Sequence, residues 1–349
     1  MTKPILATSD EELAKLGITE IVETWEDGFR TDTGRDFFEW WYFDAHLDDG
    51  STAVMVFMTK EIMERRGPIK PAIKFAINRP DGVKLSETIA YPPDTFTAVK
   101  ENCDVKIGPN WVRGDLHTYY LHTETDKMSA DLTFTGVVPP WRPRDGKAFF
   151  GDYEHYFGWV VPIPYGAVKG TLTYDGKTHT VTGSGYHDHN WGNLSLPKVQ
   201  DHWYWGRAQF GDYTVIFVEQ VTHKTYGFEK RPVFLLAKGD QILTGNGVPL
   251  TLEKRNFVKD AGGREYPTEL NFHWELDDKQ VHIKIRHPEV IEAESLLSGL
   301  SLWKRKLLGL FINPYYFRFN AEVDLKIDFG DIQAHEKGHV LYEMMILGN

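Results

Sequence analysis

Residues 183–193 read Gly-Ser-Gly-Tyr-His-Asp-His-Asn-Trp-Gly-Asn, and the rest of the chain is organised around them. The run places polar and aromatic side chains between glycines. Buried polar groups cost free energy unless they are hydrogen-bonded, so this is an unusual composition for an ordinary core strand. It indicates either a polar plug that joins two sheets or a functional site, and we favour the site because polar clusters among aromatic residues are typical of sites.

An extended conformation would divide these side chains between two faces, because successive residues of a strand point in opposite directions. One face would carry His187, His189 and Trp191, and the other Tyr186, Asp188 and Asn190. Asp188 and His189 are therefore not expected to pair directly, although they are neighbours. The flanking glycines predict bulges or close approaches of the backbone.

Composition excludes several classes of protein. The chain has 349 residues, long enough for two domains, and its aromatic share of 14% favours β structure or a large apolar pocket. Its net charge of -11 disfavours a nucleic-acid partner. Cys103 is the single cysteine, so no disulfide within the chain requires an oxidising compartment. Neither a signal peptide nor a long apolar window is visible, and we expect a cytoplasmic protein without a transmembrane segment.

Short apolar segments separated by turn residues recur along the chain and predict β-strands. Turns are expected at 48–50, 80–82 and 175–176. The first half is expected to hold strands at 38–47, 52–59, 73–78, 84–89, 111–117, 119–124, 128–135, 153–161, 170–174 and 179–183, with loops at 60–71 and 137–150. The predicted fold class is all-β, a barrel or a sandwich.

Two helices are expected. Ser9 and Glu12 form a capping box and Gly17 a C-cap, which predicts a short surface helix. Apolar residues recur at helical spacing over 296–311, beside a basic run at 304–306. That second helix would pack on or close a barrel, cover an apolar pocket as a lid, or make a weak membrane-surface contact.

A weak repeat predicts two related domains. The segment from Trp40 resembles the segment from Trp203, at an offset of 203 − 40 = 163 residues, and each leads through an Asp/Gly turn into an apolar strand. We expect an N-terminal extension at 1–35, a first barrel at 36–195 and a second barrel at 196–349. The 183–193 run would then lie at the interface of the barrels, where ligand sites are common.

Several site chemistries lack their motifs. The pair His187 and His189 has the spacing of a two-histidine metal site, but Gly192 and Asn193 stand where a glutamate ligand would be needed, so we expect no metal. No Gly-x-Ser-x-Gly elbow or dinucleotide-binding loop is present, and no cofactor is expected. Acid chemistry in an apolar pocket remains.

Glu39 and Glu219 are the candidate acids. Both are embedded in apolar sequence, and burial of a carboxyl raises its pKa. Such a group can protonate an alkene, and tryptophan and tyrosine faces can stabilise the resulting cation. The alternative for each is a carboxylate paired with an arginine, for example Arg207 or Arg318.

Four motifs together resemble the lipocalin-like carotenoid 1,2-hydratase (hydroxyneurosporene synthase) superfamily over about residues 36–349. They are Phe-Glu-Trp-Trp-Tyr at 38–42, Tyr-Phe-Gly-Trp at 156–159, the run from Gly183 to Gly192, and Trp-x-Trp-Gly-Arg-Ala at 203–208, with Gly-His-Val-Leu-Tyr-Glu at 338–343 also fitting. The resemblance implies two lipocalin-like antiparallel barrels side by side. It also implies activities such as those of kievitone hydratase-like enzymes and fungal Diels–Alderases, without a cofactor.

The resemblance implies that His189, Trp191 and an acidic residue at the position of Glu219 are important. At this position some hydratases have Tyr-x-Asp, whereas this chain has Phe-Val-Glu at 217–219. We therefore expect an enzyme acting on an apolar isoprenoid, polyene or polyketide-like molecule, by acid-initiated alkene hydration, dehydration or cyclisation in an aromatic pocket. The expected catalytic residues are Glu219, His189 and Asp188. The expected substrate-binding residues are Glu39, Trp40, Trp41, Tyr42, Tyr186, His187, Asn190, Trp191, Trp203, Trp205 and Arg207. A pericyclase and a lipid or isoprenoid carrier are the alternatives.

Overall fold

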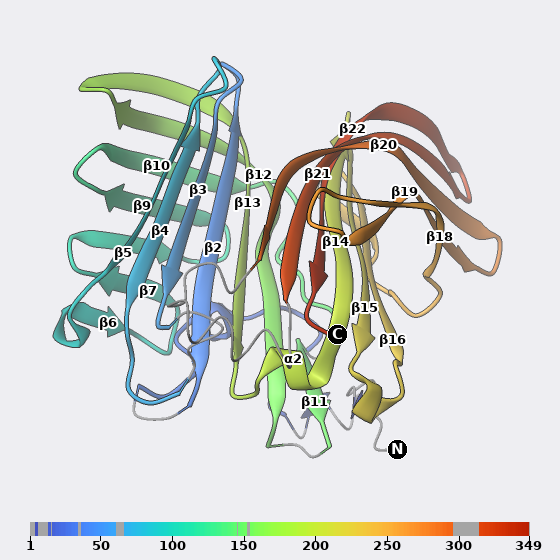
Figure 1. Ribbon diagram of the computed structural model, residues 1–349, viewed down its shortest axis with the longest axis horizontal. Helices are drawn as coiled ribbons and strands as arrows, with labels where there is room; N and C mark the ends of the chain where they lie inside the picture. Colours follow the sequence, from blue (N-terminus) through green and yellow to red (C-terminus); the bar gives the residue numbers. More distant parts are fainter. Residues whose placement is uncertain are drawn as a thin grey trace. The chain divides into compact units, whose positions relative to one another are not determined.

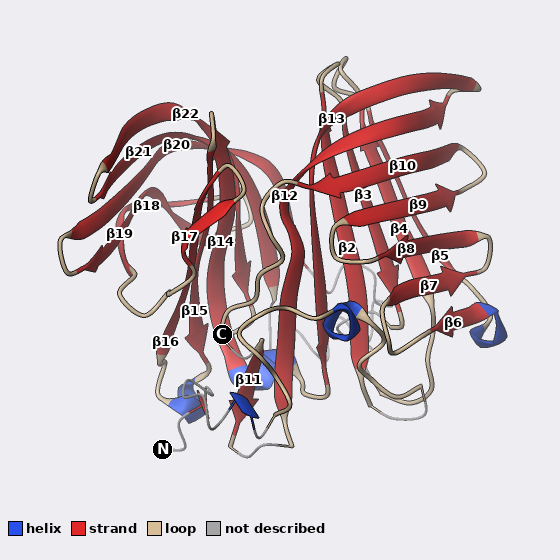
Figure 2. Cartoon of the chain, turned by 180° about the vertical axis from the view of Figure 1, so that it is seen from behind, coloured by secondary structure: helices blue, strands red, loops and turns tan. Residues whose placement is uncertain are grey.

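The computed structural model describes residues 4–5, 13–14, 16–33, 36–60, 66–144, 146–151, 154–295 and 314–348, and strands dominate it (Figure 2). The described chain separates into two compact units: a first unit of Pro4–Ser195 with Gly239–Gln241, and a second unit of Leu196–Lys238 and Ile242–Asn349. Each unit contains one antiparallel sheet, so the predicted all-β class is confirmed. No described helix has the length and apolar composition needed to cross a membrane.

The first unit holds a thirteen-stranded sheet in the order β5-β4-β3-β2-β13-β12-β10-β9-β8-β7-β6, with β11 between β12 and β1 (Figure 1). Its strands are β1 (Pro4–Ile5), β2 (Phe38–Leu47), β3 (Thr52–Met58), β4 (Ala72–Asn78), β5 (Lys84–Ala90), β6 (Phe96–Ala98), β7 (Cys103–Ile107), β8 (Asn110–Gly114), β9 (Thr118–Glu124), β10 (Met128–Gly136), β11 (Lys147–Phe150), β12 (Tyr156–Tyr174) and β13 (Lys177–Gly192). Two 3-10 turns, η1 (Thr24–Asp27) and η3 (Pro93–Thr95), accompany them.

The second unit holds a nine-stranded sheet in the order β17-β16-β15-β14-β22-β21-β20-β19-β18. Its elements are α2 (Leu196–Val199), β14 (Gln200–Phe210), β15 (Tyr213–Thr222), η4 (Lys224–Tyr226), β16 (Lys230–Lys238), β17 (Gln241–Thr244), β18 (Thr251–Lys259), β19 (Glu265–Leu276), β20 (Lys279–Ser295), β21 (Tyr315–Phe329) and β22 (Ile332–Ile346). Each sheet curves around its own core of alternate apolar residues, which explains why one face of most strands is buried.

The repeat has a counterpart in the strand order. In the first unit the opening strand β2 lies between β3 and the closing strand β13, and in the second unit β14 lies between β15 and the closing strand β22. The hairpins β2–β3 and β14–β15 contain the two similar sequence segments. In each unit, the first strand of an equivalent hairpin is therefore hydrogen-bonded to the strand that comes last in that unit's sequence, β13 or β22.

The hairpin β12–β13 is longer than the sequence indicated. Segments 153–161 and 170–174 were expected as separate strands, but β12 runs without interruption from Tyr156 to Tyr174. Its pairing with β13 shifts register between Val160 and Ile163 and again between Ile163 and Gly166. Pro162 and Pro164 fall in these irregularities, where a residue without an N–H does not break the ladder.

Glycines of the 183–193 run and its partner strand allow close backbone approach, as expected. A Cβ at Gly183 would lie 2.2 Å from the carbonyl oxygen of His46, and one at Gly158 would lie 2.3 Å from the ring of Trp191. Of the two expected helices, 9–17 is described only at 13–14 and 16–17, and 296–311 lies outside the described residues.

Candidate functional site

The alternation of β13 separates two polar clusters, one on each face of the sheet. In the ladder with β2, His187 lies opposite Phe43 and His189 opposite Trp41, while Asp188 lies opposite Tyr42. The histidines lie on the face that carries the core residues of the first unit. Asp188 and His189 do not pair, as the alternation predicts.

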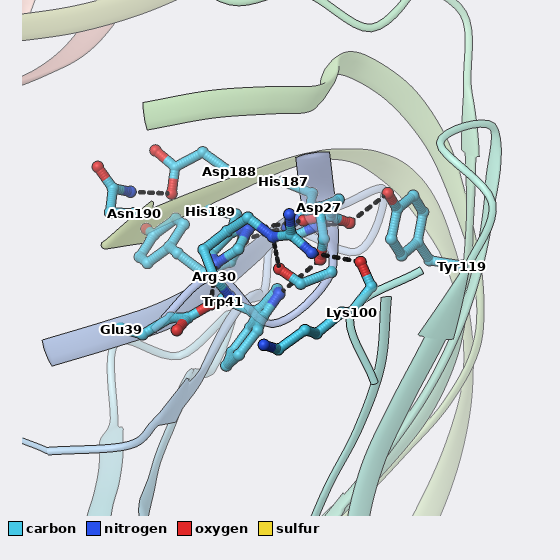
Figure 3. A network of polar contacts seen from close by, with 12 residues as sticks. Asp27, Arg30, Glu39, Trp41, Lys100, Tyr119, His187, Asp188, His189 and Asn190 are labelled. Carbon is cyan, nitrogen blue, oxygen red and sulfur yellow. Dashed lines mark hydrogen bonds and ion pairs between the residues drawn. The ribbon is translucent and has the colours of Figure 1, made fainter. Parts of the chain in front are cut away.

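The inner cluster converges on Asp27, at the end of η1 (Figure 3). Its Oδ2 accepts a hydrogen bond from the Tyr119 hydroxyl at 2.6 Å and lies 3.1 Å from His187 Nε2. Its Oδ1 lies 3.3 Å from His189 Nδ1. The Trp41 indole donates to the Asp27 carbonyl oxygen at 3.0 Å. These contacts fasten the irregular segment before β2 onto the inner face of the sheet.

Glu39 completes the cluster from β2. Its Oε1 accepts from the backbone N–H of Arg30 at 2.7 Å and lies 2.8 Å from His189 Nε2, and its Oε2 accepts from the backbone N–H of Thr31 at 2.9 Å. The Glu39 carboxylate thus pairs with an imidazole and backbone N–H groups, where the sequence analysis had considered an arginine. Glu39, His187, His189 and Asp27 each have 0% of their surface exposed. The cluster, which we call the inner network, is sealed within the unit.

Charge holds the inner network together. Burial lowers the pKa of His189, but its contacts with Asp27 and Glu39 outweigh burial and leave that pKa raised. Burial likewise opposes ionisation of Asp27, yet the neighbouring His187 and His189 hold the Asp27 pKa below its ordinary value. An imidazolium between two carboxylates is the state that these shifts favour.

Both ring nitrogens of His187 face hydrogen-bond acceptors. Its Nδ1 lies 2.9 Å from the carbonyl oxygen of Tyr42, and a carbonyl oxygen can only accept, so Nδ1 is the donor. Its Nε2 faces the Asp27 carboxylate, which is also an acceptor. The contact therefore needs a proton between Nε2 and Oδ2. The ring is also stacked on Phe43, with centroids 3.8 Å apart.

One described group has metal-ligand chemistry: potential ligand atoms of Asp27, Cys103 and His187 lie within 4.8 Å of one another. The sequence showed no third ligand beside the histidine pair, whereas the fold brings Asp27 and Cys103 to His187. The Asp27 and His187 atoms are engaged in the hydrogen bonds above. Burial and the adjacent Asp27 raise the pKa of the Cys103 thiol well above its ordinary value, which disfavours the thiolate that binds metals.

The outer cluster is centred on Asp188. Its Oδ2 accepts from the Tyr186 hydroxyl at 2.8 Å and from the Trp159 indole at 3.1 Å, and its Oδ1 accepts from the Asn190 amide at 3.0 Å. The Tyr42 ring lies edge-on to the Tyr186 ring, with centroids 6.3 Å apart. Three expected site residues are thus hydrogen-bonded together on this face, and Tyr42 packs against them.

The remaining aromatic candidates of the first unit divide between the faces. Trp191 packs against His189 on the inner side, with ring centroids 4.8 Å apart. Trp40 stacks on Phe38 on the outer side, with centroids 5.5 Å apart. Trp41 stacks on His189 at 4.5 Å, so the His189 ring is covered by indoles.

Glu219 belongs to the second unit and forms a buried ion pair there. Its Oε1 lies 2.7 Å from Lys254 Nζ and its Oε2 lies 3.2 Å from Lys230 Nζ. Glu219 is therefore an ion-paired carboxylate, as the alternative interpretation of its sequence context predicted, but its partners are lysines and not Arg207 or Arg318. Lys254 comes from β18, the edge strand farthest from β15 along the sheet order, so the pair closes the curved sheet across its interior.

The two expected substrate-binding tryptophans of β14 do not share the face of Glu219. Glu219 lies opposite Tyr204 in the β14–β15 ladder, and Tyr204 is part of the core. Trp203, Trp205 and Arg207 alternate with Tyr204 and point to the other face of β14. Glu219 and Trp203 therefore lie on opposite faces of this sheet.

Several residues of these clusters were missed by the sequence analysis: Asp27, Arg30, Tyr119, Cys103 as a neighbour of Asp27, and Lys254. Asp27 lies in an irregular segment without periodicity, and its contact with His187 joins residues 160 positions apart. The available signal was the pair Glu26-Asp27 beside Trp25 in an otherwise polar stretch. Glu26 is itself buried and lies 3.2 Å from the buried Arg142.

Comparison with known families identifies the chain. Residues 31–303 match the model of the AttH-like family, which covers more than half of the sequence. The chain belongs to the AttH-like family. The resemblance to the lipocalin-like hydratase superfamily drawn from the motifs is confirmed.

Curated relatives carry different names. The chain is 23% identical over 329 residues to the quinolone epoxide rearrangement protein asqO of Emericella nidulans, covering 84% of each chain. It is 25% identical over 215 residues to the hydroxyneurosporene dehydrogenase of Chlorobaculum tepidum, covering 49% of this chain and 53% of that one. It is 25% identical over 240 residues to the ceramide-binding protein svf1 of Aspergillus fumigatus, covering 64% of this chain and 60% of that one.

Solved structures share the fold. CghA in complex with Sch210972 superposes with a TM-score of 0.61 at 15% identity, covering 94% of this chain and 96% of that one. Kievitone hydratase from Nectria haematococca superposes with a TM-score of 0.58 at 13% identity, covering 99% and 97%. At these identities the likeness concerns the fold.

Proposed function

We propose that this protein is an enzyme that acts on an apolar isoprenoid, polyene or polyketide-like small molecule by proton transfer, leading to hydration, dehydration, cyclisation or rearrangement. The observation that carries the proposal is the match over 84% of the chain to a protein named for an epoxide rearrangement. The likeness of the fold to a hydratase and to a protein crystallised with a small molecule is consistent with it.

The charged clusters support proton-transfer chemistry in two different ways. The inner network is completely buried, and we assign it the role of fixing β2 and β13, so that Tyr186, Asp188 and Asn190 are held on the outer face. Glu219 is the carboxyl that we assign to proton transfer, because it is buried beside Tyr204 and has Lys254 at 2.7 Å as a proton-exchange partner.

The first test is native mass spectrometry of the purified protein, followed by extraction and high-resolution mass analysis of the molecules that co-purify. A bound polyene, prenyl or polyketide molecule would identify the substrate class. A second species heavier by one water would indicate a hydratase, and an isomer of equal mass a cyclase, a rearrangement enzyme or a pericyclase. A protein that neither retains nor converts such molecules would contradict the proposal.

With a substrate in hand, Glu219→Gln tests the assigned carboxyl. We expect turnover to fall by on the order of a hundredfold or more while ligand binding survives, because the amide cannot exchange a proton. Glu253→Gln is the matched control, since Glu253 is an exposed partner of Arg255 on β18. A pericyclase would keep its turnover in Glu219→Gln, because it folds the substrate rather than protonating it.

A carrier of apolar molecules is the second candidate, favoured by the match to a ceramide-binding protein. A carrier would return its ligand unchanged after long incubation, whereas an enzyme would convert it. Binding of fluorescent ceramide without any chemical change, together with unchanged mass profiles for the polyene and polyketide classes, would establish the carrier in place of the enzyme.

A further inference from the structure

Asp201 and His202, at the start of β14, form a carboxylate–imidazole pair that the proposed function does not use. Asp201 Oδ2 lies 2.7 Å from His202 Nδ1. Because the carboxylate accepts, Nδ1 carries the proton, and Nε2 of the neutral ring keeps its lone pair. The His202 side chain is 23% exposed, in contrast to the sealed His189, and within the described part of the chain no hydrogen-bond partner of Nε2 is found.

The surroundings of His202 add a cation and a phenol. Its ring lies edge-on to Tyr204, with centroids 5.8 Å apart. Lys254 Nζ lies 5.0 Å from the centroid of the same Tyr204 ring and 2.7 Å from Glu219 Oε1. Lys254 and His202 therefore both lie beside the Tyr204 ring. The Lys254 ammonium has three hydrogens and directs one of them at Glu219, so it can donate to a further acceptor.

Burial, more than the charged groups nearby, favours the neutral form of His202. Burial lowers the pKa of His202 and the positive charge of Lys254 lowers it further, while Asp201 and Glu219 act in the opposite direction without cancelling the effect. A neutral imidazole whose Nδ1–H is fixed by a carboxylate can accept a proton at Nε2. Burial and the charge of Glu219 raise the pKa of Tyr204, so that its phenol stays protonated and can donate a hydrogen bond.

We propose that His202, oriented by Asp201, is a general base for an apolar carbonyl substrate, and that the Lys254 ammonium stabilises the enolate oxygen that forms. In this step the proton leaves the carbon next to the carbonyl and goes to His202 Nε2. The electron pair of the C–H bond forms the C=C bond of the enolate, the π pair of the carbonyl moves to its oxygen, and return of the proton regenerates the ketone and the base. Asp201 acts through His202 and is a positioning residue.

The core beside this cluster is apolar and aromatic. Tyr204 adjoins Tyr342, Phe319 and Phe317, whose rings stack in sequence along the core of the second unit, with Phe319 and Tyr342 centroids 4.7 Å apart. A substrate with an acidic C–H beside a carbonyl and an aromatic or polyene tail would place its polar end at Lys254. The inference rests on the proposed function for the apolar substrate class and specifies its reactive group.

The test uses phenylacetone, an apolar ketone, in deuterium oxide, with exchange of its C–H hydrogens followed by NMR. We expect the full-length protein to accelerate exchange and His202→Gln to lose that acceleration by on the order of a hundredfold. Asp201→Asn should reduce the rate less and shift the pH profile, because the ring loses the partner that fixes its tautomer. His335→Gln is the matched control, since His335 and Asp324 form an exposed pair on the same sheet with a separation of 3.0 Å.

Exchange that is no faster than in solvent, or that is equal in His202→Gln and the wild type, would overturn the assignment. Nitrogen NMR of the histidine rings provides a check that needs no variant: a proton on Nδ1 of neutral His202 supports the assignment, and a proton on Nε2 contradicts it. Phenylacetone needs no knowledge of the natural substrate, so failure of this test and failure of the proposed function are separate results.

Discussion

Asp27 is the carboxylate on which the inner network converges, and its replacement by asparagine measures what that network contributes to stability. The amide has nearly the same shape, so Asp27→Asn leaves no cavity, but it removes the charge and replaces one acceptor oxygen with an NH2 donor. Two contacts of Oδ2 are affected, with Tyr119 at 2.6 Å and His187 at 3.1 Å, together with the 3.3 Å contact between Oδ1 and His189. The substitution also leaves buried imidazole protons without a counter-charge.

The expected cost follows from these contacts. A hydrogen bond to a charged group contributes about 1.5–3 kcal/mol, and removing one partner of a buried ion pair costs about 3–5 kcal/mol. We therefore expect Asp27→Asn to lower the free energy of unfolding of the first unit by about 3–5 kcal/mol. Tyr119→Phe removes one donor hydroxyl and should cost about 1.5–3 kcal/mol.

The assay is urea unfolding followed by tryptophan fluorescence, with the two units analysed as separate transitions where they differ. Asp81→Asn is the control, because Asp81 forms an exposed ion pair with Arg79, with 51% of its side chain exposed, and should cost less than about 1 kcal/mol. An Asp27→Asn variant that loses no more stability than Asp81→Asn would refute the view that charge holds this segment on the sheet.

Three further predictions concern the same clusters. The pKa of His189 is raised in the folded protein, so the stabilisation from its protonated ring is complete below the unfolded-state pKa of 6.5 and is lost as the pH rises through the folded pKa. The difference in free energy of unfolding between wild type and His189→Gln should therefore shrink at alkaline pH. A difference that grows with pH would contradict this. Cys103 is 1% exposed with a raised pKa, so iodoacetamide should label it slowly in the folded protein and rapidly in urea, and equal rates would count against its burial. Lys254→Met leaves the buried Glu219 with only Lys230 and should cost about 2–4 kcal/mol. Lys284→Met leaves the half-buried Glu269 with Arg286 and should cost less than about 1 kcal/mol. Equal losses in the two variants would show that the cross-sheet pair is not stabilising.

The strands could be predicted because their signals, alternating apolar residues and turn residues, lie at neighbouring positions of the sequence. The strand expected at 38–47 is β2 with the same bounds, and its partner β3 ends one residue before the expected Thr59. The division of the 183–193 run into two faces needed only the two-residue period of a strand, and the structure places a separate polar cluster on each face. The long β12 was misjudged because prolines and glycines indicate interruption, and a bulge that absorbs them leaves no local signature.

The sequence by itself determined the all-β class, the hairpins, the faces of β13 and the family, since periodicity, turn residues and motifs are properties of neighbouring positions. Only the tertiary structure decided which groups meet. His187 finds Asp27 across 160 positions, and Glu219 finds Lys254 from the opposite edge of the sheet instead of an arginine. The physical reason is that the partner of a buried charge is chosen by sheet curvature and by the path of irregular segments, and neither leaves a periodic trace in the chain.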